Sequence, residues 1–153
     1  MSDYDTDILK WSQRQAELLR RVASGENVND QIDWPNVIDE VETVGRSERS
    51  ALRSHISTVL EHLIKLQASP ATDPRNGWKV SIDRARADIA RDLEDSPSLR
   101  RLVAELIVDE TRRTGKLVAL SLQRFGQQPR AEIDNLTFTE EQVLDLWFPE
   151  DPA

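Results

Sequence analysis

Cysteine is absent from the 153-residue chain, which excludes disulfides, thiolate zinc sites and thiol catalysis. Glycine is scarce, with only 5 residues, and no phosphate-binding loop, dinucleotide fingerprint or nucleophile elbow occurs. No apolar run approaches the roughly 20 residues that a membrane span needs. The first residues, MSDYDTDILKW, are acidic where a secretory signal is basic and then apolar. The sequence therefore predicts a cytoplasmic protein with no membrane contact, no metal and no cofactor.

Basic residues are also few: the chain has 20 of them and 28 acidic residues, for a net charge of −8. Such a balance disfavours binding to a phosphate backbone, so we expect no nucleic-acid partner. The charge is uneven, because residues 26–48 hold seven acids against Arg46 alone, and 74–130 hold twelve bases against eight acids. The segment from about 131 to 153 holds seven acids and no base. This acidic C-terminal segment is expected to pack on the helices or to trail from them, and the basic middle to meet an acidic partner or this segment.

What the chain does contain is helical periodicity. Between residues 32 and 67, apolar residues fall on one narrow stripe when positions are placed about 100° apart. The stripe consists of Trp34, Ile38, Val41, Gly45, Leu52, Ile56, Val59, Leu63 and Leu66. Because both sides of Gly45 share one phase, we predict a single helix over about 34–67. We also expect Gly45 on the buried face, close to another helix.

Capping signals bound the other helices. The sequence predicts helices over about 5–23 and 77–94, and a fourth that Ser96 caps, Pro97 opens and Phe125-Gly126 ends. Asp33 is expected to cap the long helix, and Ile32 to pack on Val37. A capping box at Thr139–Gln142 predicts a short last helix. No segment shows the alternation of a strand. We therefore predict one all-α domain over 1–153, a four-helix up-down bundle-like fold with one long helix and a short C-terminal helix.

Several segments, in this order, resemble a bacterial family catalogued as domain of unknown function 29. They are Tyr4-Asp5-x-Asp7-Ile8-x-x-Trp11, Asp39-Glu40-Val41-Glu42-x-x-Gly45-Arg46, His62-Leu63-Ile64-Lys65, Asp95-Ser96-Pro97-Ser98-Leu99-Arg100 and Thr137-Phe138-Thr139-Glu140-Glu141-Gln142. The resemblance covers nearly the whole chain. It implies a small helical bacterial protein and supplies no catalytic residue.

Polar residues on stripes that should be buried provide the candidate site. Counting outward from the turns near residues 72 and 96 sets His62 and Glu110 at one level, so we expect their side chains within about 8 Å of each other, close enough to interact directly or through one water. Arg113 or Arg86 should help to neutralise Glu110. The full candidate cluster is His62, Glu110, Arg113, Arg86, Glu48 and Trp78. It is either a structural salt link or a small pocket with an acid–base pair. The four tryptophans are expected to be core anchors.

Three functions remain open from the sequence. The first is a non-enzymatic adaptor that binds another protein, or a second copy of itself as a homo-oligomer. The second is a metal- or small-molecule-binding enzyme that uses the His62 and Glu110 region. The third is an acidic regulator that resembles an antitoxin. The lack of any catalytic motif favours the first.

Overall fold

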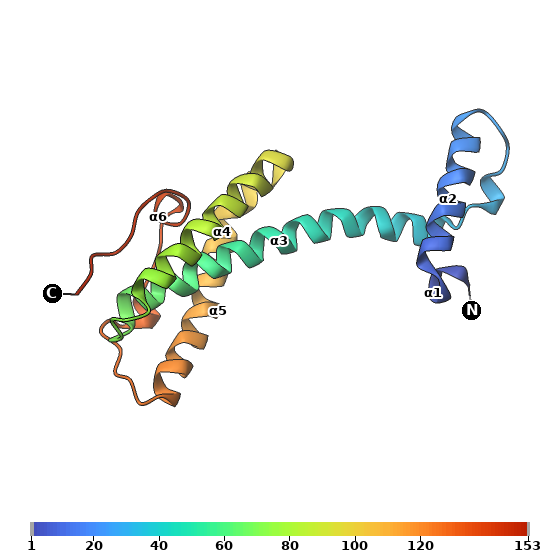
Figure 1. Cartoon of the computed structure of the whole chain (residues 1–153). Coiled ribbons are helices and arrows are strands. Elements are labelled where there is room, and N and C mark those ends of the chain that lie inside the picture. Colours follow the sequence, from blue (N-terminus) through green and yellow to red (C-terminus); the bar gives the residue numbers. More distant parts are fainter. Residues whose placement is uncertain (1, 153) are drawn as a thin grey trace. The chain divides into compact units, whose positions relative to one another are not determined.

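The structure, a computed structural model, describes residues 2–152, and within them it is all-α with no strand. The chain divides into two compact units, Met1–Ser47 and Glu48–Ala153. The expectation of a single domain stays a prediction. The helices are α1 (Asp3–Thr6), α2 (Ile8–Ala23), η1 (Asn29–Gln31), α3 (Trp34–Ala68), α4 (Arg75–Asp95), η2 (Pro97–Leu102), α5 (Val103–Arg124), η3 (Ile133–Asn135) and α6 (Glu140–Leu144), where η marks a 3₁₀ helix (Figure 1).

The first unit begins with two helices where the sequence predicted one over about 5–23. Asp7 leaves the helical region of backbone space, with φ −152° and ψ 82°, and separates α1 from α2. Its carboxylate Oδ1 accepts a hydrogen bond from the backbone N–H of Lys10 at 3.0 Å, as an N-cap does. The single-helix prediction was therefore wrong, because a local cap competes with helix continuation at this aspartate.

Polar contacts join α2 to the start of α3. The Trp11 indole Nε1 donates to Asp33 Oδ2 at 2.9 Å, and the Asp33 backbone N–H donates to Gln15 Oε1 at 2.8 Å. The second bond explains why a glutamine is buried on the α2 stripe. Hydrogen bonds from the side chain of Asn36 and from Trp11 lower the pKa of Asp33.

The core of the first unit is small. Its buried cluster consists of Leu18, Val28 and Ile32, with Val37 among the partly buried side chains against it. The predicted packing of Ile32 on Val37 is consistent with this cluster.

Helix α3 runs from Trp34 to Ala68 without a break at Gly45, which confirms the predicted long helix. The prediction that Gly45 faces another helix was wrong, because Gly45 is exposed and an added Cβ there would meet no atom within 4 Å. The first part of the stripe, hereafter the N-terminal stripe, consists of Trp34, Ile38, Val41 and Gly45 and is exposed. Trp34 is therefore not a core anchor. Burial begins at Leu52.

In the second unit, α4, η2, α5 and α6 surround the C-terminal half of α3 (Figure 1). Their shared core includes Leu52, Ile56, Leu63, Ile82, Ile89, Val103, Ile107 and Val143. Trp78 and Trp147 are partly buried against it. A second cluster gathers Ile64, Val118 and Ile133.

Two predicted helix starts in the second unit have different outcomes. The capping box at α6 is confirmed, because Thr139 Oγ1 accepts from the Gln142 backbone N–H at 3.1 Å and the Thr139 N–H donates back to Gln142 Oε1 at 2.9 Å. Ser96 stands at the N-cap position that the sequence predicted, but its hydroxyl makes no cap hydrogen bond. Pro97 opens the 3₁₀ helix η2 rather than an α-helix.

Across residues 2–152, no helix has both the length and the apolar character that crossing a membrane requires.

Candidate functional site

Glu110 is a buried carboxylate on α5, with 3% of its surface exposed. Its Oε1 lies 3.7 Å from Arg53 Nε on α3 and 4.0 Å from Arg113 Nη1, one turn further along α5. The same oxygen accepts no hydrogen bond from residues 2–152. The charge is thus balanced by two cations beyond hydrogen-bond distance, an arrangement that links α3 to α5.

The expected neutralisation of Glu110 by Arg113 is seen, whereas Arg53 was not predicted. The sequence did offer a clue to Arg53, because it directly follows Leu52, a buried residue of the long helix. The pairing of His62 with Glu110 stays a prediction. The His62 Nδ1 lies 2.8 Å from the carbonyl oxygen of Thr58 on its own helix. Because a carbonyl oxygen can only accept, Nδ1 carries a proton and donates it.

The other members of the predicted cluster make different contacts. Glu48 Oε2 accepts from the Ser96 hydroxyl at 3.1 Å, which joins α3 to the end of α4. Trp78 packs against the main core. Within residues 2–152, Glu110 and Arg113 form the one ion pair inside this set of six. Whether the six act together as a functional site stays a prediction.

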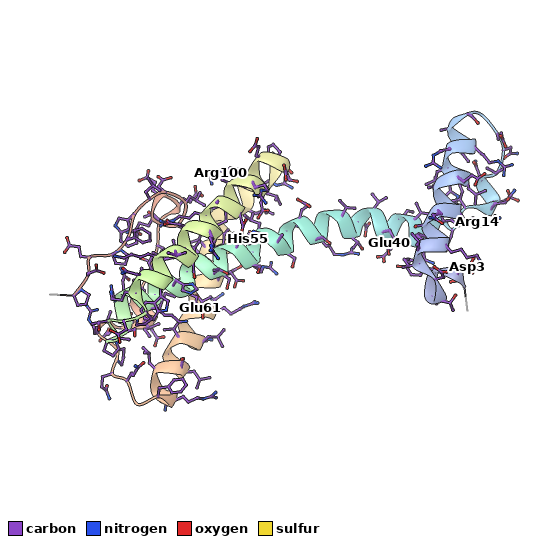
Figure 2. The ribbon with its side chains drawn as sticks, viewed as in Figure 1. Asp3, Arg14, Glu40, His55, Glu61 and Arg100 are labelled. Carbon is purple, nitrogen blue, oxygen red and sulfur yellow. The ribbon has the colours of Figure 1, made fainter. Side chains whose placement is uncertain are left out.

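His55 is the histidine that contacts carboxylates, and these carboxylate partners were not predicted from the sequence. Its Nδ1 lies 2.7 Å from Asp92 Oδ2, and its Nε2 lies 3.9 Å from Asp88 Oδ2. Figure 2 shows the ring where α3 runs beside α4. Asp88 and Asp92 are four residues apart and therefore share one face of α4. The spacing of the two aspartates can be read from the sequence. Only the packing of α4 on α3 shows that His55 lies beside them.

These ligand types do not assemble into a metal centre. Among residues 2–152, no group of three or more His, Asp or Glu side chains is placed to hold a metal ion. The His55 contacts join α3 to α4.

Arg86 on α4 holds the C-terminal segment by its backbone. Its Nε donates to the carbonyl oxygen of Val143 at 2.9 Å, and its Nη2 donates to those of Gln142 at 2.8 Å and Trp147 at 2.6 Å. The guanidinium also lies 5.0 Å from the centroid of the Phe148 ring. Burial lowers the pKa of Arg86 from its usual value. Arg86 therefore fixes the chain after α6 on α4, rather than pairing with Glu110 as the alternative prediction had it.

A second clamp holds the segment further along. Asp151 Oδ1 lies 3.0 Å from Arg75 Nε, and its Oδ2 lies 3.1 Å from Lys79 Nζ. Arg75 is buried and also donates to the Leu66 carbonyl oxygen at 2.9 Å. The hydrogen bonds from Lys79 and then Arg75 lower the pKa of Asp151. Asp151, near the end of the acidic C-terminal segment, is thus held on Arg75 and Lys79 of α4.

A groove opens between α5 and the segment around η3. It has a volume of about 280 Å³. Its walls are apolar at Ile107, Ile133 and Phe138 and charged at Arg112, Lys116 and Asp134. The groove can hold an apolar group, and none of the predicted cluster residues lines it.

The family model described as Domain of unknown function DUF29 matches residues 4–148. No curated protein and no solved structure matches the chain significantly.

Proposed function

We propose a function from the exposed surface of this chain, which belongs to the family described as Domain of unknown function DUF29. That description assigns no activity. The protein is a non-enzymatic adaptor of the bacterial cytoplasm that binds another protein. The observation that carries this proposal is the exposed N-terminal stripe of α3.

The stripe has the composition and spacing of a helix-binding surface. Trp34, Ile38 and Val41 are 42%, 53% and 68% exposed. They recur at i, i+4 and i+7, the spacing with which a helix presents anchors to a partner. Exposed apolar residues that are scattered singly need no explanation, whereas a contiguous row of them marks an interaction surface.

The polar contacts support the same conclusion. His55 links α3 to α4, Glu110 links α3 to α5, and Arg86 holds the C-terminal segment. Each of these groups has a structural partner, so the arrangement assigns none of them to a reaction.

The test is affinity purification of the tagged full chain from its native cells, with quantitative mass spectrometry. The comparison is with the double variant Ile38→Glu/Val41→Glu and with Leu117→Glu, a matched control at an exposed apolar residue of α5. We expect a partner in stoichiometric amount that the double variant loses and the control retains. A partner that both variants retain, or no stoichiometric partner, contradicts the proposal.

The groove supports a second candidate, binding of a small apolar carboxylate. Its volume of about 280 Å³ is close to the lower range of ligand pockets, and Lys116 is one of the residues that line it. Calorimetric titration with octanoate tests this candidate. Saturable binding that weakens in Lys116→Gln supports it, and the absence of heat in the parent protein rejects it.

A further inference from the structure

We propose that the partner of the N-terminal stripe is the same stripe of a second copy of this chain, with the two α3 helices antiparallel across a two-fold axis. This inference rests on the proposed function, because it names the protein that the stripe binds. Three features of the first unit support it: the imbalance of buried and exposed apolar residues, the position of Gly45, and the order of charges along α3.

The first unit does not cover its own apolar surface. Within residues 2–47, four large apolar residues are buried, namely Trp11, Leu18, Val28 and Ile32. Six are exposed, namely Ile8, Leu9, Trp34, Ile38, Val41 and Val44. A unit of this size rarely builds a sufficient core alone, and oligomerisation is one of the usual remedies. Three of these six residues, Trp34, Ile38 and Val41, belong to the N-terminal stripe, which a second copy would cover.

The position of Gly45 fits antiparallel pairing. If the two-fold axis passes between Val41 and Glu42, Ile38 of one copy lies opposite Gly45 of the other. Symmetry repeats this contact at the other end of the interface. An added Cβ at Gly45 would meet nothing within 4 Å, so there is room for the facing side chain. A large residue beside a glycine lets two helices approach closely.

The charges along α3 also favour the antiparallel direction. Between residues 33 and 46 the only base is Arg46, and the acids of this range all precede it, namely Asp33, Asp39, Glu40 and Glu42. Arg46 is half exposed and contacts Asp39 at 3.2 Å and Glu42 at 3.5 Å on its own helix. An antiparallel partner brings each Arg46 to the acidic part of the other helix. A parallel partner would align acids with acids, at a cost in electrostatic energy.

Self-association should therefore be driven by apolar contact rather than by net charge. Residues 26–48 hold seven acids against one base, so two copies repel each other at long range. Added salt screens that repulsion, and the dimer should tighten or stay unchanged as salt rises. Binding to a basic partner protein would weaken instead.

Sedimentation velocity of the full chain over a range of concentrations tests the inference. We expect a monomer–dimer equilibrium whose Kd rises at least about tenfold in Ile38→Glu, because the substitution places a charge in both of the symmetry-related apolar contacts. Gly45→Leu should also raise the Kd, because it fills the space for Ile38. Leu117→Glu should leave the Kd unchanged, and circular dichroism of each variant checks that it is folded. A dimer that none of the stripe variants weakens overturns the inference.

The direction can be tested without disturbing the fold, because the chain contains no cysteine. Val41→Cys places two thiols near the axis and should form a disulfide-linked dimer on oxidation. Trp34→Cys should not, because antiparallel pairing separates the two copies of residue 34 by about 20 Å along the helices. Efficient linkage at residue 34 with none at residue 41 overturns the antiparallel arrangement.

Two results separate this inference from the proposed function. A full chain that remains monomeric while Ile38→Glu/Val41→Glu loses a cellular partner rejects the second copy and keeps the adaptor. A monomeric full chain that shows no stripe-dependent partner rejects both.

Discussion

The Tyr4 hydroxyl donates a hydrogen bond to Glu40 Oε1 at 2.7 Å, across 36 positions of the sequence. The contact ties α1 to the first part of α3 within the first unit. Hydrogen bonding to this carboxylate is the main reason that the pKa of Tyr4 is raised to about 12, and burial adds to it. Ionising the phenol would break the bond and place two negative charges side by side.

Tyr4 is the only tyrosine in the chain, so absorbance of tyrosinate reports this bond directly. We expect a midpoint near pH 12 in the parent protein and a lower one in Glu40→Gln. The folded pKa is higher than the unfolded one, so the bond stabilises the fold below the unfolded pKa, and this contribution disappears as pH rises through the raised value. Equal midpoints in the two proteins would contradict the contact.

Removing the Arg86 side chain should release the C-terminal segment from α4. Three charge-assisted hydrogen bonds to backbone carbonyls are lost in Arg86→Ala, and the expected cost is about 2–4 kcal/mol of unfolding free energy. Urea denaturation measures this cost, and limited proteolysis after α6 should become faster. Arg101→Ala, at an exposed arginine, is the matched control. Equal stability of the two variants would show that Arg86 does not hold the segment.

The second clamp should loosen in acid. Because the pKa of Asp151 is lowered in the folded protein, its pairing stabilises the fold above the unfolded pKa, and this stabilisation is lost as pH falls through the folded pKa. A carboxyl titration followed by NMR should give a midpoint below the ordinary aspartate value. In Lys79→Gln the midpoint should rise, because the main hydrogen-bond donor is gone. An unchanged midpoint would mean that Lys79 does not set the pKa of Asp151.

Arg53 should matter only while Glu110 is charged. We expect Arg53→Ala to destabilise the protein, because it leaves a buried carboxylate with the more distant Arg113 alone. In the Glu110→Leu background the same substitution should have little effect. A double-mutant cycle in urea should give a coupling energy of about 1 kcal/mol. A coupling energy close to zero would mean that Arg53 and Glu110 lie close together without stabilising each other.

Features that depend on neighbouring residues could be predicted from the sequence. The long helix was predicted over about 34–67 and runs from Trp34 to Ala68, because the periodicity of apolar residues continues across Gly45. The capping box at Thr139 was predicted because its bonds join residues three positions apart. The family resemblance also lay in the sequence, since it depends on the order of short segments.

What meets across the fold depended on the tertiary structure. The position of a histidine in the sequence does not show which residue of another helix it contacts. Only the packing of α4 on α3 brings Asp92 to His55. Arg86 binds backbone carbonyls, which carry no residue-specific signal, so its role in holding the C-terminal segment was invisible in the sequence. The stripe of α3 was uniform in sequence but divides into an exposed part and a buried part. Periodicity determines which side chains share a helix face, whereas burial depends on which other elements cover that face.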